Sequence, residues 1–405
     1  MPSFGRLLLA SVALFAAQPA LAQDIVVTGK PLKDTAAGLA ECIKRGCPPN
    51  EDMAATIVHA ENQFVSGDYE GARKTLHSSL GRNRKHAKEY PVELSNVLRA
   101  NGRVAEHLGE AKDFQLSTLD MRDTLKDGFG ENDFRTLVAQ VEVGDSRAKL
   151  GYPDEAERIY RDVEKRALEA KQFRIASFAR LRLSLLAQAR FEDDPNSRNA
   201  AALDSRLAGL IDSPLADSGD FVMAAKVLRA RKDRRTGSTA STDELVRTFA
   251  SAGGVSRPVL LFAEPVGQID PFAGRADGVN GQAPAWTRWS NNRYGQWVDV
   301  GFWIGQDGKV SDVEVLRQQG STQWAKPVMR SISRRVYAPL RQNGDSTPGF
   351  YMVERYTLTA RVAQGEETGT RLRIREARPR IEMLELTPDA GEEKLAKEEK
   401  VAKAD

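Results

Sequence analysis

Two hydrophobic patterns divide the chain into a helical part and a β-rich part. From about residue 50, apolar residues recur at intervals of three and four, as in helices that bury one face. Between 298 and 304 the period falls to two, which predicts a strand with one buried face. We therefore expect an α+β multidomain protein with a helical domain over 51–232, a linker over 233–255 and a β module over 256–386.

A turn followed by a small and then a bulky residue occurs three times in the helical part. The pairs are Ala72 with Leu76, Ser117 with Met121, and Ala156 with Tyr160. A small residue lets two antiparallel helices approach, and the bulky residue one turn later fills the remaining gap. Spacings of 45 and 39 residues between the small residues favour an α-solenoid of stacked helical hairpins. An ordinary helical bundle is the alternative.

The β module is expected to have the order β-β-α-β. A glycine-rich hairpin loop at 305–308 joins the strand over 298–304 to a second strand over 309–316. Apolar residues then recur every fourth position from Trp324 to Val336, which predicts a helix. A third strand is predicted at 350–360.

Both parts are similar to known families. Residues 51–190 resemble degenerate tetratricopeptide repeats, although the first-helix Trp is missing and the period exceeds the usual 34 residues. That resemblance implies a concave groove for a partner peptide. Residues 285–363 resemble the TonB C-terminal domain. The shared residues are Asp307-Gly308, Val310, Val313, Val315, Leu316, Gly320, Tyr337-Ala338-Pro339 and Gly344. Gln318-Gln319 and Pro327 depart from the family pattern.

The TonB resemblance implies a periplasmic domain that binds outer-membrane receptors by adding a receptor strand to its sheet edge. The candidate edge is the final strand, 351–361, and its partner-binding residues are Tyr351, Val353, Arg355, Thr357 and Thr359. Pairing of this strand inside the domain, or with a second copy, is the alternative. The β-prone residues 24–29 look like the strand that such receptors offer, and we expect either that they add to the sheet or that they form a floppy N-terminus.

The first 22 residues predict a secretory signal peptide. Arg6 precedes an apolar run over 7–17, and Ala20-Leu21-Ala22 fits a cleavage site after Ala22. The run is shorter than the roughly 20 residues that a membrane span needs. We therefore expect a periplasmic protein without a membrane span after cleavage. Residues 23–50 are expected to be flexible, and the charged tail at 387–405 is expected to be disordered.

Two cysteines, Cys42 and Cys47, predict a disulfide in an exported protein. A metal site would need further ligands, and the four histidines show no ligand spacing. We expect neither a metal nor a cofactor.

The sequence favours a binding protein over an enzyme. It lacks G-x-S-x-G, H-E-x-x-H, P-loop and G-x-G-x-x-G motifs. A net charge of +3 gives no argument for nucleic acid. We expect a periplasmic protein-binding or scaffolding protein that joins helical repeats to a TonB-like β-augmentation module. One alternative is an energy-transducer (TonB) family protein that contacts TonB-dependent receptors, and another is an envelope hydrolase with an unrecognised site.

Overall fold

The computed structural model describes residues 31–266, 295–341, 349–363, 374–375 and 379–387. The predicted signal peptide, residues 24–29 and all of the predicted tail at 387–405 except Thr387 lie outside the described residues. The described chain is α+β, as the hydrophobic patterns predict, with helices followed by a small antiparallel sheet. Among the described helices, none combines the length and apolar character needed to cross a membrane.

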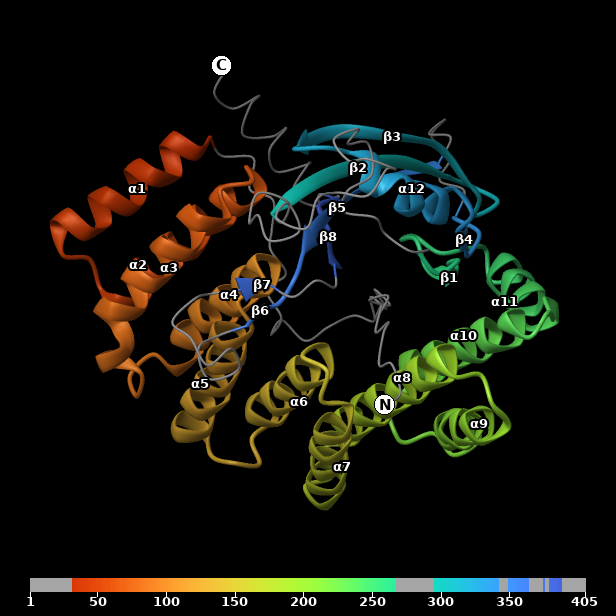
Figure 1. Cartoon of the computed structure of the whole chain (residues 1–405). Helices are drawn as coiled ribbons and strands as arrows, with labels where there is room; N and C mark the ends of the chain where they lie inside the picture. Colours follow the sequence, from red (N-terminus) through yellow and green to blue (C-terminus); the bar gives the residue numbers. More distant parts are fainter. Residues whose placement is uncertain (1–30, 267–294, 342–348, 364–373, 376–378, 388–405) are drawn as a thin grey trace.

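The first eleven helices, α1 to α11, form a curved stack that we call the helical arc (Figure 1). Each helix packs against the next along the chain, and the two ends of the arc lie on either side of the sheet (Figure 1). The helices are α1 (Leu32–Arg45), α2 (Pro49–Val65), α3 (Tyr69–Asn83), α4 (Pro91–Leu108), α5 (Ala111–Phe129), α6 (Phe134–Lys149), α7 (Pro153–Glu169), α8 (Phe173–Asp193), α9 (Ser197–Ile211), α10 (Gly219–Arg235) and α11 (Ala240–Ser251). A short 3-10 helix, η1 (Arg84–His86), follows α3.

The repeated small and bulky residues lie inside the arc. All six members of the three pairs are buried, with exposed fractions between 0 and 5%. The structure also shows a more regular signal in the turns after α2, α4 and α6. These turns contain Gly67, Gly109 and Gly151, which are 42 residues apart and all have positive φ angles. Glycine adopts this backbone conformation without the steric penalty that a side chain brings.

Two segments expected to be irregular contain helices. Part of the expected flexible segment 23–50 is α1, whose Leu39 and Cys42 are buried. Within the expected linker 233–255, α10 continues to Arg235 and α11 follows. Both expectations were wrong for the same reason: α1 and α11 contain few large apolar residues, and Leu39 of α1 and Leu245 of α11 are buried against neighbouring helices.

The main sheet has four antiparallel strands in the order β3-β2-β5-β8. Its strands are β3 (Val310–Gln319), β2 (Gln296–Gly305), β5 (Gly349–Thr359) and β8 (Arg380–Glu385). The helix α12 (Lys326–Ser333), preceded by the 3-10 helix η5 (Gln323–Ala325), covers one face. The β2-β3-α12-β5 order agrees with the predicted β-β-α-β order. Two small pairs complete the described strands: β1 (Leu260–Phe262) with β4 (Val336–Tyr337), and β6 (Val362–Ala363) with β7 (Ile374–Arg375).

The predicted partner-binding edge is not an edge. β5 lies between β2 and β8, and its Glu354–Thr359 half pairs with β8 residue by residue. The pairing continues past β8, because the Leu386 amide donates to the Val353 carbonyl at 2.7 Å. The edges of the described sheet are β3 and β8. The alternative, pairing of this strand inside the domain, holds for Glu354–Thr359. The strand that closes this edge, β8, lies beyond the region of family resemblance, where nothing in the sequence indicates which strand it joins.

Candidate functional site

The strands of the sheet bury two chemically different faces. Val298, Val300, Phe302 and Ile304 of β2 form a core with α12. On the opposite face, Asp299 and Arg355 are fully buried although both are charged. The helical arc covers this second face near α2 and α4 (Figure 1). We call this contact between the arc and the sheet the junction.

Arg355 is the centre of the junction. Its guanidinium forms a two-pronged ion pair with Asp299, with Nε–Oδ1 at 2.6 Å and Nη2–Oδ2 at 2.9 Å. It also donates to the carbonyls of Phe64 and Val65, at 2.7 and 2.8 Å. Those carbonyls end α2, where the helix leaves acceptors unpaired and favours a cation. The Trp297 ring lies 3.9 Å from the guanidinium carbon. One side chain therefore joins β5, β2 and α2.

A second group of hydrogen bonds lies beside Arg355. The Thr357 hydroxyl is 2.9 Å from the Tyr69 hydroxyl and 3.0 Å from Nδ1 of His107. Phe64 stacks edge-on against the His107 ring, with centroids 4.8 Å apart. Burial lowers the pKa of His107 to about 3, so the ring is neutral at physiological pH. Burial likewise raises the pKa of Tyr69.

Two of the three repeated glycine turns contact the sheet. A Cβ at Gly67 would lie 2.6 Å from the Trp297 ring, and a Cβ at Gly109 would meet the Ala360 carbonyl. The Gly109 carbonyl accepts a hydrogen bond from the Val362 amide at 2.8 Å. A Cβ at Gly151 would meet nothing within 4 Å. The first two turns therefore need glycine for close approach as well as for backbone conformation, whereas the third needs it for conformation alone.

A buried cluster of ionisable groups joins α4 and α6 to β8. Lys149 at the end of α6 pairs with Glu106 of α4 at 2.5 Å, and Arg380 pairs with Glu382 within β8 at 2.9 Å. Burial opposes the charge on Glu106, but Lys149 outweighs it and the pKa falls to about 2. Burial and the neighbouring Glu106 raise the pKa of Glu382 to about 8.

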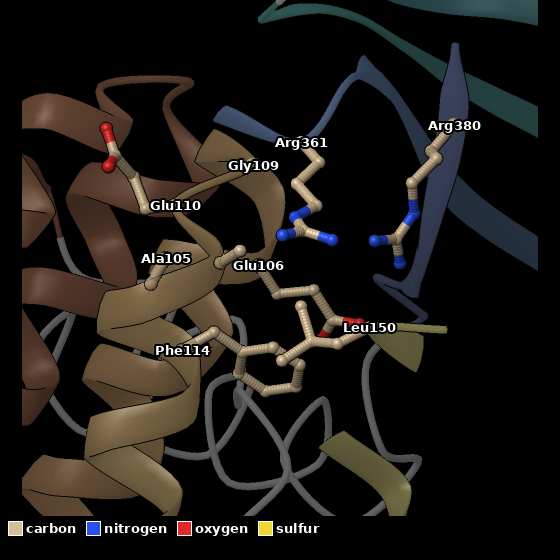
Figure 2. A pocket seen from close by; sticks show the side chains of 9 residues that line it. Ala105, Glu106, Gly109, Glu110, Phe114, Leu150, Arg361 and Arg380 are labelled. Atoms are coloured by element: carbon tan, nitrogen blue, oxygen red, sulfur yellow. The ribbon is translucent and has the colours of Figure 1, made fainter. Parts of the chain in front are cut away.

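A small pocket opens beside this cluster. It is lined by Ala105, Glu106, Gly109, Glu110, Ala111, Phe114, Leu150, Arg361 and Arg380. Figure 2 shows the guanidinium groups of Arg361 and Arg380 pointing toward one another across it. It has room for about one water molecule. Sites for small organic ligands usually enclose about 300–1,000 Å³. The pocket that the described residues form is therefore much smaller than such a site, and it lies within the junction.

The five predicted edge residues have two different environments. Arg355, Thr357 and Thr359 are buried in the junction. Val353 is partly buried and packs against the apolar core of the first helices. Tyr351 lies beyond the covered area and stacks with Trp303, with ring centroids 5.1 Å apart. The residues do share one face of the strand, but most of that face meets the chain's own helices.

The predicted disulfide agrees with the geometry of the N-terminal part. Cys42 and Cys47 are bonded, with Cα atoms 5.1 Å apart, across the turn at Gly46 that ends α1. A carboxylate oxygen of Glu51 lies within 4.8 Å of both sulfurs. Among the described residues, these three side chains form the group whose spacing would suit a metal ion. Sulfurs that are bonded to one another offer no thiolate to a cation.

The helical half of the junction was not predicted from the sequence. Its residues each occupy an ordinary position in a helical repeat, and the sequence assigns them no role in a contact with the sheet. They are Tyr69, Glu106, His107 and Lys149. The equal spacing of Gly67, Gly109 and Gly151 was the available signal for those turns. No family model matches the chain, and neither a curated protein nor a solved structure matches it.

Proposed function

We propose that the protein is a non-catalytic, protein-binding scaffold of the periplasm, exported by a signal peptide cleaved after Ala22. In this proposal a curved stack of tetratricopeptide-like hairpins carries a β module similar to the TonB C-terminal domain. The proposal rests on the residues that resemble that domain and on the β2-β3-α12-β5 order, which is the order the resemblance implies.

One observation carries the proposal: β8 extends the sheet by pairing with β5. Adding a strand to an open sheet edge is a general mode of peptide recognition, in which main-chain hydrogen bonds supply much of the affinity. Here the chain supplies the added strand itself. The β5 edge is therefore a strand-binding site with an internal occupant, and capture of a strand from another protein requires β8 to leave.

The internal strand also fixes the β module on the arc. Leu384 of β8 and Leu386 just after it pack against the apolar core of the first helices. Together with Arg355, these contacts hold arc and sheet as one body. A rigid body of this kind suits a scaffold that presents surfaces at fixed positions.

The test is to free the β5 edge and offer the strand in trans. Leu384 of β8 pairs with Arg355 of β5. Leu384→Pro removes the backbone N–H of β8 at this position and thereby weakens the pairing of β8 with β5. We expect a fluorescent peptide with the sequence of residues 380–387 to bind the Leu384→Pro variant and not the unaltered chain, as measured by fluorescence anisotropy. A scrambled peptide is the control. If the variant keeps its helical circular dichroism and binds neither peptide, the β5 edge is not a strand-binding site.

A second experiment tests the scaffold role in cells. A photo-crosslinking residue at the exposed Leu316 on β3 samples the open part of the sheet, and one at the buried Leu76 of α3 serves as the matched control. We expect protein adducts in the periplasmic fraction from position 316 alone. Adducts at both positions, or at neither, would contradict the proposal.

A further inference from the structure

β8 closes only part of the β5 edge. β5 runs over Gly349–Thr359, whereas its residue-by-residue pairing with β8 covers Glu354–Thr359. One further main-chain bond, from the Leu386 amide to the Val353 carbonyl, lies beyond that ladder. Among the described residues, none forms a main-chain hydrogen bond with Gly349–Met352 from the β8 side. We call Gly349–Met352 the open segment of β5.

The open segment offers main-chain groups for pairing. In an antiparallel strand, every second residue points its N–H and its C=O at the same neighbour. Val353 points at β8, so Tyr351 and Gly349 point to the same side of the strand. On the other side the segment is held in place, because β2 pairs with all four of its residues. Main-chain groups exposed along a fixed strand are a template for a further strand.

The chain itself is poorly suited to extend β8 along the open segment. Thr387 follows the last main-chain bond, and its hydroxyl oxygen, instead of a main-chain carbonyl, accepts a hydrogen bond from the Val353 amide at 3.0 Å. The next residue is Pro388, which would face Tyr351 if the strand continued in the same register. Proline has no N–H to donate to the Tyr351 carbonyl. A strand with another residue at this position therefore pairs better with the open segment than the chain's own continuation does.

We propose that the open segment is the entry point at which a strand from another protein pairs with β5 and from which it displaces β8. This proposal rests on the proposed function, because it describes how the strand-binding site loses its internal occupant. The incoming strand runs antiparallel to β5, as β8 does, and its C-terminal residues pair first with Tyr351 and Gly349. Its preceding residues then replace Leu386 and Leu384 one after another. Each step exchanges one ladder position for an equivalent one, so β8 need not detach before the new strand binds.

The positions of β8 also define the partner. Leu386 is buried and Leu384 packs against the same apolar core of the first helices, so a replacing strand needs apolar residues at these alternate positions. The residue that faces Tyr351 would lie beside the ring pair of Tyr351 and Trp303, which favours a third apolar or aromatic side chain. The partner is therefore an extended protein segment with apolar residues at three alternate positions and no proline at the third.

Peptide binding to the unaltered full-length chain tests the entry point. One peptide has the sequence of residues 380–387, and a longer peptide adds Val-Thr-Val at its C-terminus, so that the first added valine faces Tyr351. We expect the longer peptide, and not the shorter one, to bind the unaltered chain in fluorescence anisotropy. Hydrogen exchange of the isotope-labelled chain should show that bound peptide removes the protection of the β8 amides and leaves that of β2. Binding that leaves β8 protected would overturn the displacement.

Two methylated forms of the longer peptide are the matched controls. N-methylation of the first added valine removes the N–H that faces the Tyr351 carbonyl, and we expect binding to weaken by about tenfold or more. N-methylation of the threonine that follows removes an N–H on the outer side of the added strand, so the affinity should change little. Equal effects of the two methyl groups, or equal binding of the shorter and longer peptides, would overturn the entry point.

The Leu384→Pro variant separates this failure from failure of the proposed function. If the longer peptide binds Leu384→Pro but not the unaltered chain, the β5 edge binds strands and the open segment is not where displacement begins. If the longer peptide binds neither protein, the β5 edge is not a strand-binding site, and both proposals fall.

Discussion

The two faces of the sheet are buried by opposite means. Toward α12, strand β2 presents Val298, Val300 and Phe302, which lose contact with water and need no specific partner. Toward the arc, the same strand presents Asp299, which is equally buried but depends on Arg355. An apolar face accepts any neighbour of suitable shape, whereas a buried charge accepts only a partner that satisfies it. The polar face therefore specifies where the arc docks, and the apolar face stabilises the β module itself.

The largest expected effect separates the buried guanidinium from an exposed one on the same carboxylate. Arg355 and Arg317 both pair with Asp299, but their side chains are 0% and 52% exposed. We expect Arg355→Met to lower the free energy of unfolding by roughly 3–5 kcal/mol, because it removes one partner of a buried ion pair. Arg317→Met should cost at most about 1 kcal/mol. Urea unfolding followed by circular dichroism measures both, and equal losses would refute the distinction.

The next effect concerns the glycine turns. Gly67→Ala places a methyl group against the Trp297 ring and also strains a residue with φ of 86°, and we expect a loss of roughly 2–4 kcal/mol. Gly151→Ala strains the same backbone conformation but meets nothing within 4 Å, so about 1–2 kcal/mol is expected. Thermal and urea unfolding of the two variants give the comparison. A loss at Gly151 that matches the loss at Gly67 would show that close approach of the sheet contributes nothing.

The polar face should also be sensitive to acid. The folded chain keeps His107 neutral, with a pKa of about 3, whereas the unfolded chain binds a proton below about pH 6.5. This contribution to stability is present above pH 6.5 and is lost as the pH falls toward 3, by up to about 1.4 kcal/mol per pH unit. His107→Gln should show a shallower decline in unfolding free energy from pH 7 to 4. Parallel curves for the variant and the unaltered chain would refute the assignment.

The smallest expected effect compares two threonines on the same face of β5. The Thr357 hydroxyl contacts Tyr69 and His107, so Thr357→Val should cost about 1 kcal/mol per hydrogen bond lost. Among the described residues, the buried Thr359 hydroxyl has no hydrogen-bond partner. Thr359→Val should therefore be neutral or slightly stabilising. Opposite results for the two variants would contradict the hydrogen-bond assignments.

The sequence determined those features that depend on neighbours along the chain. The period-two pattern at 298–304, the hairpin loop at 305–308 and the buried small and bulky residues of the helices were all predicted correctly. The cysteine pair was also predicted, since a separation of five residues brings Cys42 and Cys47 together across one turn. Period and turn chemistry are local properties, and therefore a single sequence carries them.

Only the tertiary structure decided which face of the sheet would be covered, and by what. From the sequence, Arg355 is expected to be an exposed strand residue, because its hydrogen-bond acceptors, the carbonyls of Phe64 and Val65, are about 290 positions away in the chain. The same holds for β8, whose alternation gives no sign that it will pair with β5. Long-range polar pairing depends on the geometry of two separately formed surfaces, and no local pattern records it. The strand that the sequence offers as an open edge is closed in the folded chain for that reason.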